Sequence, residues 1–373
     1  MWRSCFGVVL FLFLFCLFPY YLYAQEGTDQ YQLKLPPEVL EPLIPEDNPI
    51  TPAKIELGKK LYFDKRLSID DTVSCATCHN PKFGFSDSKK VAEGIQGKKG
   101  ARNSPTVLNA TFYDEQFWDG RAPTLEEQAK GPLVNPVEMG FPSHDALIEK
   151  LRAIPEYSNA FKESFGTEDL TIEHLAQAIA SFERTLITLE SPFDQFIAGK
   201  ENAISPEAKR GFELFQGKAR CITCHEFNRT YPFFTDNKYH NIGVAIHGKN
   251  FAELARKATK EPDIAKLAHE EGASELGRYL VTKQTKDIGA FKTSTIRNIE
   301  LTAPYMHDGS LATLEEVIDF YNKGGEPNPN LDGGIRPLNL TAQEKKDLVA
   351  FLKSLTSRGG ANFDWAELQE LAP

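Results

Sequence analysis

The pentapeptide Cys-x-x-Cys-His occurs twice in the chain, at Cys75–His79 and at Cys221–His225. Two thiols at this spacing can bond to the two vinyl groups of one haem, and the histidine that follows can ligate the iron from one face. A single copy would also fit half of a zinc site, a redox dithiol or chance. Two copies, in a chain whose only other cysteines are Cys5 and Cys16, favour haem. The sequence therefore predicts two covalently bound haems c, attached through Cys75, Cys78, Cys221 and Cys224 and ligated by His79 and His225.

An export signal is expected because haem c is attached outside the cytoplasmic membrane. Arg3 supplies a positive start, residues 6–18 are almost wholly apolar, and Ala24 precedes a polar stretch. This pattern predicts a signal peptide over residues 1–24, cleaved near Ala24, and a periplasmic protein. An uncleaved anchor is the alternative, since the apolar run approaches the length that spans a bilayer. Pro19 and the small residue at position 24 favour cleavage.

The net charge of the chain limits the kinds of binding partner that it can have. The chain of 373 residues carries 42 Lys and Arg against 52 Asp and Glu, a formal net charge of −10. This excludes a general nucleic-acid binder, whose binding rests on basic side chains, and it is compatible with a basic protein partner.

The elements around the two haem motifs repeat. Thr51-Pro52 precedes the first motif and Ser205-Pro206 precedes the second, each followed by a segment with an apolar face. A hydroxyl residue before a proline is typical of a helix start. The sequence therefore predicts a helix before each haem motif.

A second repeat lies downstream at a constant offset of 189 positions. Asn109 corresponds to Asn298, and the segment 124–127 corresponds to 313–316. The haem motifs are only 146 positions apart, so the second half holds 43 extra residues. We place them near residues 248–285 and expect a surface excursion with a helix of its own.

The remaining segments read as helices. Apolar residues recur at three- and four-residue steps from Ile172 to Leu189, and Thr341 with Glu344 forms a capping box before another apolar face. No run of alternating strand residues appears. We predict a mainly α protein of two cytochrome-c-like domains, each with one covalent haem c. The domains are expected at residues 25–195 and 196–373, joined near 190–204, with the haems facing a shared interface.

Several blocks resemble the bacterial di-haem cytochrome c peroxidases, including their MauG-like branch. The matching blocks are FDKRLS, RNSPTVLNATF, FWDGRA, EQAKGP and TAPYMHDGS. The resemblance covers nearly all of the chain after the signal. It implies that the N-terminal haem meets hydrogen peroxide and that the C-terminal haem passes electrons to it.

The resemblance also implies site residues. Trp118 resembles the tryptophan between the two haems, while Gln128 and Glu138 resemble the distal pocket residues of the peroxide-binding haem. Asn103, Thr302 and Pro304 resemble the ligands of a calcium ion, the latter two through backbone carbonyls. Glu138 is the natural base for peroxide cleavage, because burial raises the pKa of a carboxylate towards the working pH.

The repeat distinguishes the two haems. Position 132, which corresponds to Tyr321 at the offset of 189, is a proline. A phenol can ligate iron and a proline cannot, so the haem of the first motif (haem 1) should be open and the haem of the second motif (haem 2) capped by Tyr321. The MauG-like branch carries tyrosine at this place, and the electron-transferring peroxidases carry methionine. Met306 is a competing ligand, although it corresponds to Phe117 and packing is the simpler role.

One departure from the family concerns haem 1. Many members carry a histidine in the loop before RNSPT that blocks this haem until haem 2 is reduced. No histidine lies between Asn80 and Arg102, and the matching place is near Ile95 and Gln96. We therefore predict a five-coordinate or water-bound haem 1 without reductive activation.

The sequence thus predicts a periplasmic peroxidase that reduces hydrogen peroxide to water with electrons from a small cytochrome c or similar donor. The alternative is a MauG-like oxidase that uses a high-valent iron state to oxidise a protein or small molecule. A third class, a di-haem electron carrier, would need neither Glu138 nor Gln128. The donor and the oligomeric state, a homodimer included, stay open.

Overall fold

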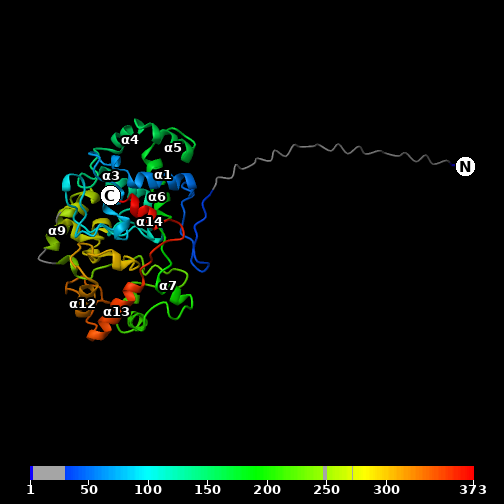
Figure 1. Cartoon of the computed structure of the whole chain (residues 1–373). Helices are drawn as coiled ribbons and strands as arrows, with labels where there is room; N and C mark the ends of the chain where they lie inside the picture. The colour runs from blue at the N-terminus through cyan, green and yellow to red at the C-terminus, as the bar shows by residue number, and fades with distance from the viewer. Residues whose placement is uncertain (3–29, 247–249, 271) are drawn as a thin grey trace.

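The computed structural model describes residues 1–2, 30–246, 250–270 and 272–373, and the predicted signal peptide lies outside them. The described chain is mainly helical, and its only strands are two two-residue segments (Figure 1). The helices are α1 (Pro52–Phe63), α2 (Cys75–Cys78), α3 (Leu125–Val134), α4 (His144–Arg152), α5 (Pro155–Phe165), α6 (Ile172–Glu183), α7 (Pro192–Ile197), α8 (Pro206–Gln216), α9 (Phe251–Ala258), α10 (Ile264–His269), α11 (Tyr279–Thr282), α12 (Leu314–Lys323), α13 (Ala342–Ser354) and α14 (Trp365–Leu371). The strands β1 (Tyr239–His240) and β2 (Phe291–Lys292) pair antiparallel.

The first half of the chain is built on the crossing of α1 and α6. Thr51 caps α1 as predicted, its side chain accepting a hydrogen bond from the backbone N–H of Lys54. Gly58 permits the close approach, since a Cβ there would lie 1.9 Å from the carbonyl oxygen of Ala178. Leu57 and Leu61 are buried in the core beside this crossing. The glycine thus sets how closely the two helices pack.

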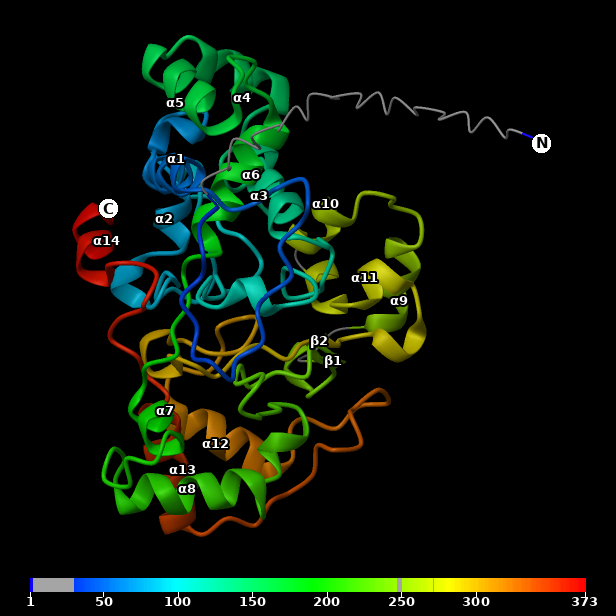
Figure 2. The same ribbon diagram turned by 90° about the vertical axis from the view of Figure 1, so that its right-hand side faces the viewer.

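The second half repeats this crossing with α8 and α13. Ser205 caps α8, and Thr341 with Glu344 forms the predicted capping box at the start of α13. Gly211 plays the part of Gly58, because a Cβ there would lie 2.0 Å from the carbonyl oxygen of Asp347. The two halves lie one above the other in both views, with β1 and β2 between them (Figure 2).

The downstream repeat is confirmed in detail. α3 and α12 begin and end 189 positions apart, as predicted from the sequence offset. Asn109 and Asn298 both adopt left-handed backbone conformations, with φ of 62° and 57°. Their side-chain amides donate to the same hydroxyl, Thr188 Oγ1, at 3.0 and 2.8 Å. The two copies therefore meet at Thr188, which joins the halves.

One predicted helix is shorter than its apolar pattern. α6 ends at Glu183, so Leu186 and Leu189 lie beyond it although both are buried. The prediction of a helix through Leu189 was wrong, because apolar spacing indicates burial. The chain turns after α6, and Thr188 lies where it accepts a hydrogen bond from Asn109.

The extra residues of the second half form a unit rather than a loose excursion. α9, α10 and α11 pack around a small core of their own that includes Leu267, Leu276 and Leu280. The segment also lies against the first half, where the guanidinium of Arg102 donates to the carbonyl of Ser274 at 2.6 Å. Figure 2 shows it beside α3.

Two short helices cross the predicted boundary between the halves. α7 includes Phe193, which packs in the core of the second half. α14, at the C-terminus, returns to the first half, where Trp365 donates from Nε1 to the carbonyl of Pro81 at 2.9 Å. The boundary at 195/196 stays a prediction. None of the helices within the described residues has the length and apolar character needed to cross a membrane.

Candidate active site

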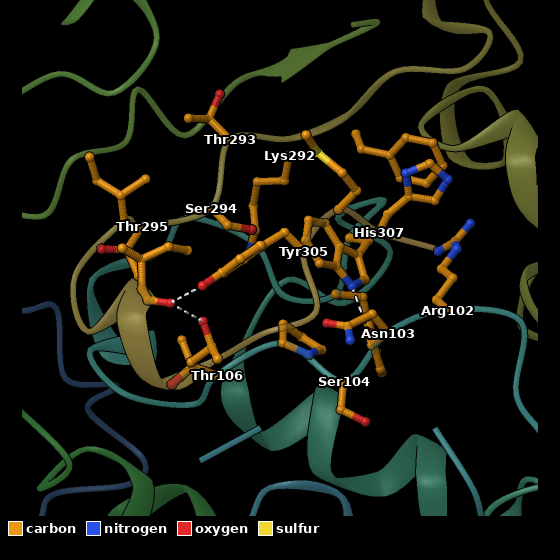
Figure 3. A pocket seen from close by; sticks show the side chains of 18 of the residues that line it. Arg102, Asn103, Ser104, Thr106, Lys292, Thr293, Ser294, Thr295, Tyr305 and His307 are labelled. Carbon is orange, nitrogen blue, oxygen red and sulfur yellow. Dashed lines mark hydrogen bonds between the residues drawn. The ribbon is translucent and has the colours of Figure 1, made fainter. Parts of the chain in front are cut away.

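Both Cys-x-x-Cys-His motifs face one large cavity between the halves. Its empty space, counted out to its open mouths, is about 3120 Å³. Figure 3 shows part of the wall, where the segment from Arg102 to Thr106 lies opposite the segment from Lys292 to Thr295. Every other predicted site residue also lines the cavity: Asn103, Trp118, Gln128, Glu138, Thr302, Pro304 and Tyr321. Residues spread over more than 200 positions therefore share one space.

The two motif histidines are held in the same way. His79 Nδ1 lies 2.9 Å from the carbonyl oxygen of Pro105, and His225 Nδ1 lies 3.0 Å from that of Phe234. A carbonyl only accepts, so Nδ1 carries the proton and Nε2 has a free lone pair. Burial lowers the pKa of both imidazoles, which favours this neutral form. A fixed Nδ1 and a free Nε2 are what a metal-ligating histidine needs.

The four motif cysteines fit covalent haem attachment better than zinc binding. All four are free of disulfides. Burial raises the pKa of Cys78 and of Cys221 to about 12, so these thiols are neutral here, and each motif offers only three of the four ligands of a structural zinc site. The donor set of each motif, two thiols beside one free imidazole nitrogen on an apolar cavity, therefore fits a c-type haem.

His240 lies beside Cys224 without being available as a ligand. Its Nε2 lies 2.9 Å from Asp236 and its Nδ1 lies 2.7 Å from Asp332. Cys224, Asp236 and His240 do bring their ligand atoms within 4.8 Å of one another. Both imidazole nitrogens are nevertheless engaged, and the hydrogen bond to Asp236 is the main cause that raises the pKa of His240 to about 11. A doubly hydrogen-bonded imidazolium cannot donate a lone pair to a metal.

The end of the cavity nearest the first motif carries a carboxyl and an amide. Gln128 projects from α3, and Glu138 follows that helix in a segment whose backbone is clamped by the preceding loop, where Ile95 N–H donates to the Glu138 carbonyl at 2.9 Å. The Glu138 side chain is 21 % accessible and lines the cavity. Burial raises its pKa to about 7, against the opposing charge of Arg121.

Trp118 stands at the contact between the halves. Its Nε1 donates to the carbonyl of Asn103 at 2.9 Å. Its ring centroid lies 6.4 Å from that of His307, its counterpart at the offset of 189. His307 in turn stacks on Phe291 at 3.6 Å and pairs with Glu275 at 2.8 Å. An aromatic chain therefore runs across the cavity wall from one half to the other.

Tyr321 faces the cavity at its other end. Its hydroxyl has no hydrogen-bond partner among the described residues, and burial raises its pKa above the ordinary value. Pro132, the corresponding residue on α3, also lines the cavity and offers no ligand atom. Met306 lines the cavity too, with the left-handed φ of 74° that its counterpart Phe117 shares at 67°. Both residues that are candidates to ligate the iron of the second haem, Tyr321 and Met306, therefore line the cavity.

The three predicted calcium ligands all line the cavity wall. Asn103, Thr302 and Pro304 all contact the cavity, and their oxygens, Oδ1 and the two carbonyls, accept no hydrogen bond from the described residues. The Asn103 amide is oriented by its own donation to the carbonyl of Lys89 at 2.8 Å. Three neutral oxygens without donors fit a hard cation such as Ca²⁺.

Two cavity residues were missed at the level of sequence. Lys292 is buried, donates to the carbonyl of Glu115 at 2.8 Å and lies over the ring of Tyr113, and burial lowers its pKa to about 7. His269 lines the cavity with its Nε2 3.5 Å from Glu138, because the segment that carries it packs against the first half. No sequence pattern pointed to it.

The chain is similar to known proteins over most of its length. The family described as di-haem cytochrome c peroxidase matches residues 52–202. Methylamine utilization protein MauG of Methylorubrum extorquens is 42 % identical over 318 residues, which cover 85 % of this chain and 82 % of that protein. Cytochrome-c peroxidase IdrP1 of Denitromonas iodatirespirans is 40 % identical over 335 residues, covering 87 % of each chain.

Solved structures agree with these relatives. The crystal structure of a MauG-like protein associated with microbial copper homeostasis superposes with a TM-score of 0.73 at 32 % identity, covering 88 % of this chain and 96 % of that one. The di-haem peroxidase BthA from Burkholderia thailandensis gives a TM-score of 0.67 at 26 % identity, covering 83 % and 87 %. The chain belongs to the di-haem cytochrome c peroxidase family and is an oxidoreductase.

Proposed function

We propose that the chain is an exported di-haem peroxidase that reduces hydrogen peroxide to water. Two electrons, delivered singly by a small cytochrome c or similar carrier, and two protons would convert one peroxide into two waters. The observation that carries the proposal is the single cavity walled by both haem motifs, with Glu138 at one end and Tyr321 at the other. Relatives named cytochrome-c peroxidase support the substrate and the kind of donor.

Each half would hold one haem c and so form one cytochrome-c-like domain. Cys75 and Cys78 would attach haem 1, and His79 would ligate its iron. The second motif would attach haem 2 with His225 in the same role. The fixed Nδ1 atoms of both histidines support these assignments. A c-type haem supplies an iron that binds peroxide at an open position and exchanges single electrons.

Glu138 and Gln128 would do the proton work at haem 1. A base that takes a proton from peroxide and returns it to the leaving oxygen is most effective when its pKa lies near the working pH. The pKa of about 7 for Glu138 meets this condition. Gln128, an uncharged donor and acceptor on the same wall, would hold peroxide or water in line with that carboxylate.

Trp118 would mediate electron transfer between the haems. Its indole N–H is fixed by the Asn103 carbonyl, and Asn103 is also a candidate calcium ligand. A calcium ion held by Asn103 Oδ1 and the carbonyls of Thr302 and Pro304 would therefore restrict the motion of Asn103, whose carbonyl holds Trp118 in place. The three unpaired oxygens support that role for the ion.

A MauG-like oxidase is the second candidate, because Tyr321 rather than Met306 would cap haem 2. Tyr321 is at the position that corresponds to Pro132, and its unpaired hydroxyl faces the cavity. The loop 93–99 that packs on Glu138 has Ile95 buried where other members place a blocking histidine, which supports an open haem 1. The MauG proteins among the relatives support this candidate equally.

Turnover with peroxide and reduced cytochrome c separates the two functions. Rapid decay of the oxidised state formed by peroxide, on adding reduced cytochrome c, supports the peroxidase. A long-lived state indifferent to that donor supports the oxidase. A protein that does not react with peroxide at all refutes both.

Export to the periplasm belongs to the same proposal. Covalent haem attachment requires it, and residues 1–24 have the composition of a signal peptide. Mass spectrometry of the purified protein tests it, since cleavage near Ala24 leaves an N-terminus at about residue 25.

A further inference from the structure

His269 comes from the second half but reaches the pocket of the first haem motif. It is the last residue of α10, within the extra segment that follows the second motif. Its Nε2 lies 3.5 Å from Glu138 Oε1, and its side chain is 17 % accessible. The segment of α9 to α11 lies beside α3 in Figure 2, where α3 carries Gln128.

The ring of His269 has no other partner within the described chain. Its Nδ1 is buried and makes no hydrogen bond, and its Nε2 faces Glu138. A buried N–H without an acceptor is rarer than a buried acceptor without a donor. We therefore place the proton on Nε2, the nitrogen that lies 3.5 Å from Glu138 Oε1. The separation is long for a hydrogen bond, but such contacts commonly shorten when a site is filled.

The surroundings keep this imidazole neutral. Burial, together with the cations of Arg121 and Arg102, lowers the pKa of His269 to about 4. Asp119 acts in the opposite direction, and it is itself paired with both arginines. His269 and Glu138 consequently do not form an ion pair at neutral pH.

We propose that His269 is a positioning residue for Glu138, donating a hydrogen bond from Nε2 that stabilises and orients the ionised carboxylate. The inference rests on the proposed function, since it assigns His269 a role through the base of that reaction. It also means that the extra segment of the second half completes the pocket of haem 1. Without the hydrogen bond, the pKa of the Glu138 carboxyl group would be higher.

The test measures how fast cyanide binds to the oxidised holoprotein between pH 5 and pH 9. Hydrogen cyanide, like peroxide, must give its proton to a base as it binds, so the rate reports Glu138 without turnover. His269→Leu removes the donor and should move the acidic midpoint up by about one pH unit, the equivalent of one hydrogen bond to a charged group. Binding at pH 6 should then be close to tenfold slower.

Conservative variants separate hydrogen bonding from packing. In His269→Gln an amide N–H can occupy the position of Nε2, so the midpoint should return towards that of the parent. In His269→Asn the shorter amide cannot reach Glu138, so the midpoint should stay raised. His174→Gln is the matched control, because that imidazole is on α6, stacks on Phe165 and is remote from the cavity; its profile should equal the parent's.

The outcomes are distinct for the two proposals. A parent protein that binds cyanide and reacts with peroxide, together with unshifted profiles for the Leu and Asn variants, would overturn the role of His269 alone. Equal shifts in the Gln and Asn variants would also overturn it, since that pattern reports packing. A parent that reacts with neither ligand would instead refute the proposed function. Haem content and the midpoint of thermal unfolding identify any variant that fails to fold, and the Asn variant then decides.

Discussion

Replacing Glu138 by glutamine should remove both the base and its pH dependence. With a pKa of about 7, about a tenth of the carboxyl groups are ionised at pH 6 and about nine tenths at pH 8. The second-order rate constant for the reaction with peroxide should therefore rise about tenfold between these pH values. The sign follows from burial, which raises the pKa and so leaves the inactive, protonated form dominant below neutrality.

Glutamine keeps the size of the side chain but cannot take a proton. A positioned general base contributes roughly 10²–10⁴ in rate, so Glu138→Gln should slow the peroxide reaction by that factor at pH 8 and flatten the profile. Stopped-flow absorption of haem 1 after mixing with peroxide measures both effects. An acidic limb that survives in the variant would show that another group is the base. Glu127→Gln, an exposed carboxylate on α3, is the matched control.

Three further predictions concern the proposed iron ligand Tyr321, the proposed calcium ion and the packing of α1 against α6. Tyr321→Met should raise the reduction potential of haem 2 in a spectroelectrochemical titration, within the span of about 0.8 V that axial ligands command; an unchanged potential and spectrum would exclude Tyr321 as ligand. Removing calcium with a chelator should slow electron transfer between the haems severalfold and be reversed by adding Ca²⁺, because Asn103 also holds Trp118; metal analysis that finds no calcium in the purified protein contradicts this. Gly58→Ala should lower the free energy of unfolding by about 1–3 kcal/mol in denaturant titrations, because its Cβ would overlap the Ala178 carbonyl, and Gly166→Ala, where nothing lies within 4 Å, is an open-space comparison that carries only the backbone cost of a positive φ.

Much of the fold could be predicted from the sequence because helix starts and the internal repeat depend on residues close together in the chain. Hydroxyl residues before a proline predicted the starts of α1 and α8, and the constant offset of 189 relates α3 to α12. The same offset paired Tyr321 with Pro132 and so exposed the difference between the two ends of the cavity. The correspondence between the two copies holds in the structure because both copies have the same local structural preferences.

The parts that sequence could not supply depend on contacts between distant segments. His269 carries no local mark, and only the packing of α10 against the first half brings it to Glu138. The apolar spacing through Leu189 suggested a longer helix, yet the chain leaves α6 so that Thr188 can receive hydrogen bonds from both repeats. Tertiary contacts override spacing at such places.

The central claim is that two like motifs hold unlike haems, one open and one capped. The most direct measurement is the absorption and electron paramagnetic resonance spectrum of the oxidised protein before and after adding azide, with the haem content determined alongside. The account predicts two haems per chain, of which the one attached at Cys75 and Cys78 responds to azide while the one facing Tyr321 does not. Two haems that both respond, or that both fail to respond, would contradict it.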